Sequence, residues 1–180
     1  ARRIGRNDLL TVVLCLLATV VGVGSFLFHT VAQRWASLAD VIPIAVFILI
    51  YLYTAMQRYL GLGWIQALPA TVAVFAFSLL AREAVIWMAD GTLNGSESYA
   101  PALALLVLAS LVLAAMRHNA AFTTAVATAV FALSLVARTL DTQICQAFPM
   151  GTHVFWHLLN GTMIGILLFA MIRHGRVSRS

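Results

Sequence analysis

The sequence is poor in charged residues and contains no lysine. Charged residues make up 9% of the 180 residues, whereas apolar residues make up 62%. Ordinary soluble domains carry about 25% charged residues, so this composition excludes that class. No stretch between the apolar runs is long enough to hold a soluble domain. The low share of charged residues and the high share of apolar residues predict an all-α, polytopic integral membrane protein, with residues 1–180 forming a single transmembrane domain.

Every basic residue is an arginine, and the net charge of +5 is not gathered in one patch. The arginines flank the apolar runs, which is the distribution that the positive-inside rule describes for membrane proteins. We therefore expect no nucleic acid as a partner. The absence of lysine, together with the many alanines and leucines, favours a bacterial protein of the inner membrane.

Cysteine is scarce as well. Cys15 lies within an apolar run, and Cys145 lies in a loop that we place near the opposite face of the membrane. A disulfide requires Cα atoms within about 7 Å of each other. We therefore predict no disulfide between these two residues.

The sequence contains six apolar segments. Each is near the ~20 residues that a helix needs to cross ~30 Å of hydrocarbon, the second being the shortest. They lack the alternation of a membrane β-barrel and are too long for its strands. The predicted spans are Leu9–Thr30, Asp40–Met56, Trp64–Met88, Tyr99–Met116, Ala120–Arg138 and Thr152–Ile172.

The arginines predict the orientation of these spans. Six crossings place most of them on one side, which the positive-inside rule makes cytoplasmic. The residues on this side are Arg2, Arg3, Arg6, Arg58, Arg117, Arg173, Arg176 and Arg179. The C-terminus is then cytoplasmic as well.

Several polar residues are predicted to lie near the non-cytoplasmic face. Ser25 and His29 occupy the last turns of the first span, and Asp40 opens the second. His153 and His157 open the sixth. Polar side chains are costly in hydrocarbon unless they are paired or bind something, so together these residues indicate a site.

The histidines favour a metal ion. His153 and His157 are four residues apart, which places both imidazoles on one face of a helix. With His29 they leave a fourth tetrahedral position for water, as in catalytic zinc sites, although imidazole also binds other divalent ions. Zinc polarises carbonyl groups and lowers the pKa of water toward ~7, which favours hydrolysis. Asp40 is then expected to transfer the proton, and Ser25 to donate a hydrogen bond to the oxyanion.

These residues carry a resemblance to a known family. The pattern Ser25-Phe-Leu-Phe-His29, Asp40 eleven residues later, and His153-x-x-x-His157 in the last span is similar to that of the alkaline ceramidases. That family belongs to a superfamily with the progestin and adipoQ receptors. The most specific stretches are 24–30 and 151–161, and the likeness covers most of the chain.

The resemblance implies a role for each site residue. It implies that His29, His153 and His157 bind zinc, and that the serine and the aspartate assist hydrolysis of a membrane lipid amide. Ceramide would yield a sphingoid base and a fatty acid. The family has seven spans where this sequence shows six, so we expect the first span to be missing upstream of Arg2.

Other interpretations compete at single positions. Asp40 can cap the start of a helix that carries Pro43 in its first turn. Ser25, with Gly22 and Gly24, can simply allow two helices to approach closely.

The site as a whole also has rival functions. A haem-binding electron carrier would use His29 and a histidine of the last span as axial ligands. A receptor-like or scaffold protein would keep zinc for structure and bind lipid without turnover. The sequence does not specify the oligomeric state or the acyl chain.

The remaining polar residues near the outer face are expected to pair with one another. Arg82 and Glu83 are adjacent, and Arg138 and Asp141 are three residues apart on one helix face. Asn160 is predicted to orient a ligand through a supporting hydrogen bond.

Overall fold

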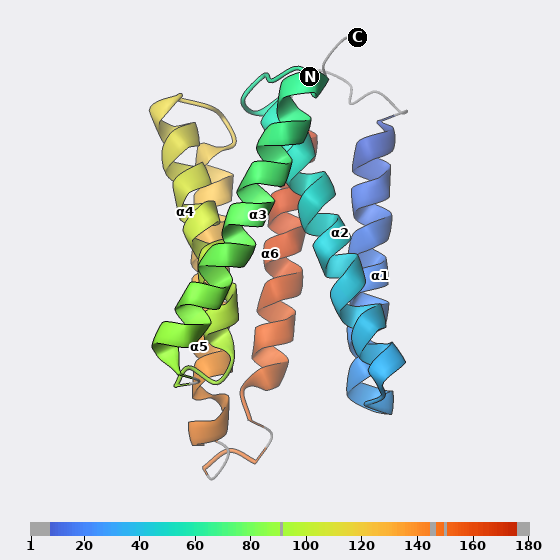
Figure 1. Ribbon diagram of the computed structural model, residues 1–180, viewed down its shortest axis with the longest axis vertical. Coiled ribbons are helices and arrows are strands. Elements are labelled where there is room, and N and C mark those ends of the chain that lie inside the picture. Colours follow the sequence, from blue (N-terminus) through green and yellow to red (C-terminus); the bar gives the residue numbers. More distant parts are fainter. Residues whose placement is uncertain (1–7, 91, 145–146, 150, 176–180) are drawn as a thin grey trace. The chain divides into compact units, whose positions relative to one another are not determined.

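The computed structural model describes residues 8–90, 92–144, 147–149 and 151–175, and within them the fold is all-α (Figure 1). The α-helices are α1 (Leu9–Val31), α2 (Arg34–Arg58), α3 (Trp64–Ala89), α4 (Ala100–Ala115), α5 (Ala121–Ile144) and α6 (His153–His174). A 3₁₀ helix, η1 (Ser96–Tyr99), precedes α4. No strand occurs in the described residues, which confirms the predicted fold class.

Six helical segments of the described chain are long and apolar enough to cross a membrane, η1 being counted with α4. This confirms the expectation of a multi-pass membrane protein. Cys145 lies outside the described residues. So do the terminal arginines Arg2, Arg3, Arg6, Arg176 and Arg179.

The chain divides into two compact units, and the boundaries between them fall within α3 and α6. One unit extends to Ala73 and includes the chain from Met171 onward, and the other is Val74–Ala170. The first unit is built on α1 and α2, and the second on η1, α4, α5 and most of α6.

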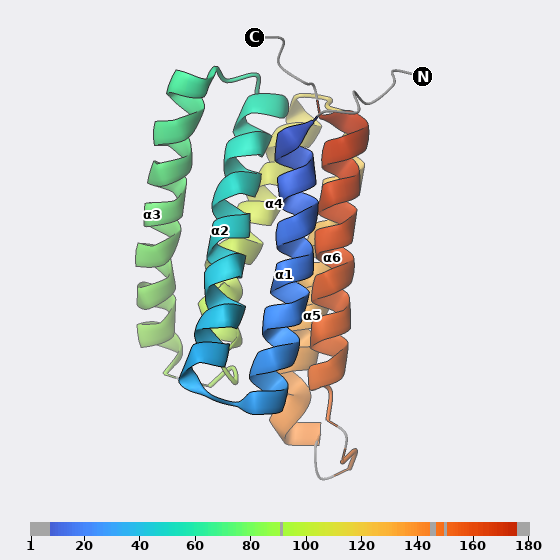
Figure 2. The same cartoon turned by 90° about the vertical axis from the view of Figure 1, so that its right-hand side faces the viewer.

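α1 and α2 form a hairpin with a very short connection (Figure 2). Ala32 adopts the left-handed conformation, with φ 53° and ψ 34°, and its N–H donates to the Phe28 carbonyl at 3.0 Å. This bond caps α1, and Gln33 then begins the next helix as its N-cap. The tight turn places the last residues of α1 beside the first turns of α2.

α2 begins at Arg34, six residues before the predicted start of the second span at Asp40. The helix also includes residues 34–39, which lie outside the predicted span. Asp40 therefore lies in the second turn, where the backbone N–H groups are already used by helical hydrogen bonds. The helix-cap role for Asp40 is wrong, and so is the placement of Pro43 in the first turn.

Gly24 is the closest point of approach between α1 and α2. Pro43 has no N–H, so the Ala39 carbonyl four residues earlier lacks its helical donor. The buried Gly24 packs against this carbonyl, because a Cβ at position 24 would overlap the Ala39 oxygen and lie 3.1 Å from Asp40 Cα. A Cβ at Gly22 would meet nothing within 4 Å. The close-packing interpretation is therefore confirmed for Gly24 and wrong for Gly22.

The opposite end of the hairpin is joined by a buried ion pair. Arg58 Nη2 contacts Asp8 Oδ1 at 2.5 Å, and the two side chains are only 6% and 13% exposed. Arg58 Nη1 also donates to Thr11 Oγ1 at 2.9 Å, and the Thr11 hydroxyl donates to Asp8. Burial would raise the pKa of the Asp8 carboxyl, but the hydrogen bonds from Arg58 and Thr11 and the Arg58 charge hold it below its usual value.

In the second unit, polar side chains join η1 and α4 to α5. Ser110 Oγ and Thr128 Oγ1 are 3.0 Å apart between α4 and α5. Thr139 Oγ1 donates to Ser96 Oγ at 2.9 Å, which fixes η1 on α5. α5 runs to Ile144, six residues beyond the predicted end of its span at Arg138, and so extends Asp141 toward the start of α6.

We predict that Gly24→Ala destabilises the protein by about 1–3 kcal/mol, because the new methyl group overlaps the Ala39 carbonyl. Gly22→Ala is the matched control in the same helix, and it should be neutral or slightly stabilising because alanine favours a helix. The midpoint of thermal unfolding in detergent measures both effects. Equal midpoints for the two variants would contradict the close approach.

We predict that Asp8→Asn destabilises the protein by about 3–5 kcal/mol at neutral pH, because it leaves the Arg58 charge buried without its partner. The folded pKa of Asp8 is lowered, so its contribution is present above the unfolded value of about 3.9 and disappears as the pH falls. The variant and the unaltered protein should therefore converge in stability in acid, once the pH falls below the lowered pKa of Asp8. A difference that persists unchanged into acid would argue against this pair.

Candidate metal site

The start of α6 is fixed by side chains and carbonyls of α5. Asp141 Oδ1 accepts the backbone N–H of Thr152 at 2.6 Å and that of His153 at 2.9 Å. Thr152 Oγ1 donates to the Ala137 carbonyl at 2.6 Å. The first N–H groups of a helix have no helical acceptor, and Asp141 supplies one from a neighbouring helix. These bonds determine the residue at which α6 begins.

His153 and His157 lie on one face of α6, as their spacing predicts. Their ring centroids are 4.8 Å apart with an interplanar angle of 71°. Trp156 packs against both, with its ring centroid 5.0 Å from that of His153 and 4.3 Å from that of His157. The Arg138 guanidinium lies over the Trp156 ring at 4.5 Å. The buried Trp156 indole thus contacts both the Arg138 guanidinium of α5 and the two imidazoles.

His29 lies in the last turn of α1, and its ring is oriented by its own helix. His29 Nδ1 is 2.8 Å from the Ser25 carbonyl oxygen. A carbonyl oxygen can only accept a hydrogen bond, so Nδ1 carries the proton. The lone pair is therefore on Nε2, which is free of this bond and is the nitrogen suited to a metal ion.

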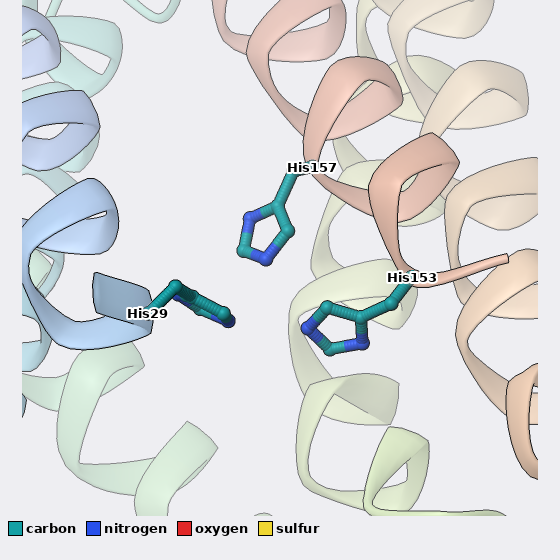
Figure 3. A group of neighbouring side chains, drawn as sticks. All are labelled: His29, His153 and His157. Carbon is teal, nitrogen blue, oxygen red and sulfur yellow. The ribbon is translucent and has the colours of Figure 1, made fainter. Parts of the chain in front are cut away.

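The three histidines offer a set of ligands for one ion. One ring nitrogen from each of His29, His153 and His157 lies within 4.8 Å of the others (Figure 3). This spacing is close enough for the three to hold a metal ion. Imidazole suits zinc and several other transition metals, so the donor set fits the expected zinc without identifying it.

Asp40 lies beside the His29 part of the site. Its charge interacts with His29, while its Oδ1 atom is buried and has no hydrogen-bond partner in the described structure. Buried polar atoms are nearly always satisfied, so an unpaired carboxylate oxygen suggests a missing partner such as water, a proton or a ligand. The role of Asp40 in proton transfer stays a prediction.

Ser25 contacts His29 through its backbone carbonyl. This bond gives the Ser25 position a part in orienting the imidazole. It does not depend on the hydroxyl group, so the role of the Ser25 side chain stays a prediction.

In the described part of the chain, one of the two ion pairs expected among the other polar residues forms and one does not. Arg82 and Glu83 form the expected ion pair at 2.5 Å, on an exposed surface. The expected pair between Arg138 and Asp141 is absent from the ion pairs of the described residues, because Asp141 instead lies 3.8 Å from His153. Asn160 accepts from Ser134 Oγ at 2.8 Å and so joins α6 to α5.

Three residues near the histidines were not predicted to support them. They are Asp141, Trp156 and Arg138. Trp156 could have been found from its position between the two histidines, since a residue three after His153 shares its helix face. Asp141 gives no such signal, because it precedes His153 by twelve residues and acts across a loop.

Comparison of the chain with protein-family models, curated proteins and solved structures found no match. The similarity to the alkaline ceramidases therefore stays a prediction that stands on the residues quoted above. The site has to be interpreted from its own geometry.

We predict that replacing His29, His153 or His157 with alanine removes most of the bound metal, because two imidazoles hold an ion far more weakly than three. His118→Ala is the control, since His118 Nδ1 accepts the backbone N–H of Ala120 and so has a local structural role. Elemental analysis of the purified proteins gives the metal content. Full metal occupancy in a His157→Ala protein would show that the ion binds elsewhere.

Proposed function

We propose that the protein is an intramembrane, zinc-dependent amide hydrolase that cleaves ceramide, or a closely related lipid amide, into a sphingoid base and a fatty acid. The observation that carries this proposal is the grouping of three histidine nitrogens, with Asp40, whose Oδ1 atom is buried without a hydrogen-bond partner, near one of them. A structural zinc site has four protein ligands, whereas three leave room for reaction. The quoted resemblance to the alkaline ceramidases suggests the substrate.

His29, His153 and His157 would hold the ion through one nitrogen each. Zinc bound by three imidazoles supplies Lewis acidity that favours attack of water on a carbonyl group. The hydrogen bond from His29 Nδ1 to the Ser25 carbonyl keeps that ring in the orientation and tautomer that binding requires.

Asp40 would transfer the proton. Its unpaired oxygen would accept a proton from the attacking water as the water oxygen bonds to the acyl carbon. The amide C–N bond then breaks, and Asp40 returns the proton to the departing nitrogen. The products are a carboxylic acid and an amine, and the carboxylate of Asp40 is regenerated.

Ser25 would stabilise the negative charge that develops on the acyl oxygen. A hydroxyl group can donate one hydrogen bond to this oxyanion, and loss of such a donor typically costs ~10²–10³ in rate. Ser25 is one helical turn before His29, so the two side chains share a face of α1.

A lipid substrate agrees with where these residues lie in the sequence and fold. His29 belongs to a helix that is apolar enough to span a membrane, and so do the two histidines of α6. A lipid amide can reach such a site sideways, without leaving the bilayer. The scissile bond of a lipid lies near the boundary between acyl chains and headgroups, as the helix ends do.

We predict that the purified, zinc-loaded protein hydrolyses a fluorescent ceramide in detergent or liposomes. His157→Ala should abolish turnover, and Asp40→Asn should lower kcat by about 10²–10⁴ because general acid–base catalysis is lost. His118→Ala should retain full activity. Chromatography of the released fatty acid measures the reaction.

Two other experimental results would indicate a different function. Zinc-loaded protein that binds ceramide but never cleaves it would be a receptor-like or scaffold protein. A purified protein with the visible spectrum of haem would be an electron carrier. Unchanged turnover by a metal-free His157→Ala protein would also refute the proposed chemistry.

A further inference from the structure

We propose that Asp141 is a positioning residue for the metal centre, and that its negative charge holds His153 in the orientation and tautomer needed to bind the ion. This inference rests on the proposed function only in requiring that His153 is a metal ligand. It concerns a residue of α5 that belongs to neither the ligand set nor the proton-transfer machinery.

The first support is the geometry of the two carboxylate oxygens. Oδ1 of Asp141 accepts hydrogen bonds from the backbone N–H groups of Thr152 and His153. Oδ2 is turned toward the side chain of His153 and lies 3.8 Å from its Nδ1 atom. One carboxylate therefore contacts both the backbone and the ring of the same histidine.

The second support is the effect of this charge on the ring. An imidazole that carries its proton on Nδ1 directs a positive N–H dipole toward Asp141, whereas the other tautomer directs a lone pair toward it. The carboxylate therefore favours the proton on Nδ1 and leaves the Nε2 lone pair for a metal ion. Carboxylates beside metal-binding histidines commonly act in this way and tune metal affinity.

Packing against Trp156 further restricts the orientation of the His153 ring. The Trp156 indole lies with its centroid 5.0 Å from that of His153, and it is itself buried beneath the Arg138 guanidinium. His153 is thus confined between a carboxylate and an indole. A ring with few orientations loses little entropy when it binds an ion.

A simple helix cap is the alternative role, and the two roles respond differently to substitution. Asp141→Asn keeps an amide oxygen that can accept from the Thr152 and His153 N–H groups, but it removes the charge beside the ring. Asp141→Ala removes both. A cap requires only the acceptor, whereas positioning of His153 requires the charge.

The test measures Co²⁺ affinity and the ligand-field spectrum of the full chain in detergent. We expect Asp141→Asn to fold normally, to bind Co²⁺ about 10- to 100-fold more weakly, and to show an altered spectrum. Asp141→Ala should bind more weakly still and unfold at a lower temperature. Asp90→Asn is the matched control, because it makes the same charge change at an exposed residue after α3, and it should match the unaltered protein.

Wild-type affinity and spectrum in Asp141→Asn would overturn the proposal and leave Asp141 a helix cap. Because a variant can fail to fold, histidine ¹⁵N NMR of the unaltered protein gives a second test. A proton on Nδ1 of His153 is expected, and a proton on Nε2 would refute the inference. If the protein binds Co²⁺ as expected but cleaves no amide, the hydrolase proposal fails while the role of Asp141 stands.

Discussion

The candidate site depends on where α6 begins. An α-helix turns by about 100° per residue, so a start shifted by a single residue would rotate both of its histidines away from their present face. The helix starts at His153 because Asp141 accepts the N–H groups of Thr152 and His153. The Thr152 hydroxyl group also donates to a carbonyl of α5. The acceptor comes from the end of α5, which extends beyond its apolar run. The part of α5 beyond its predicted span thus fixes the residue at which α6, the helix of His153 and His157, begins.

Several threonine hydroxyl groups in the helices donate to a backbone carbonyl of their own helix. The hydroxyl groups of Thr30, Thr71 and Thr162 each donate to the carbonyl four residues earlier, at 2.8–2.9 Å. Such bonds allow a hydroxyl group to lie in hydrocarbon at little cost. A carboxylate has no proton to donate to a carbonyl, and Asp40 Oδ1, like Glu97 Oε2, is buried without a hydrogen-bond partner among the described residues. A buried carboxylate oxygen without a partner carries a desolvation cost, and the position of Asp40 near His29 agrees with the proposed proton transfer.

The helices, the grouping of the three histidines and the position of Trp156 could be predicted from the sequence, whereas the contact of Asp141 with His153 could not. Apolar length gives the spans, and the i, i+4 spacing gives the common face of His153 and His157. α2 begins six residues before its predicted span and α5 ends six residues after its own, because a helix need not end where its apolar run ends. Because α2 begins before Asp40, this residue lies within the helix and not at its N-cap. The contact of Asp141 with His153 crosses a loop and depends on how α5 ends, and no spacing rule encodes it.

The charges around the histidines help to distinguish a catalytic site from a structural one. Three neutral imidazoles leave a divalent ion with its full charge in a medium of low dielectric constant, so nearby carboxylates are needed. Asp40 interacts with His29, and Asp141 lies beside His153, which supplies two negative charges outside the ligand set. A structural zinc site would be expected to use one of these carboxylates as its fourth ligand. Among the described residues the ligand group contains the histidines alone. Asp40 lies outside this ligand group, as the proposed transfer of a proton requires.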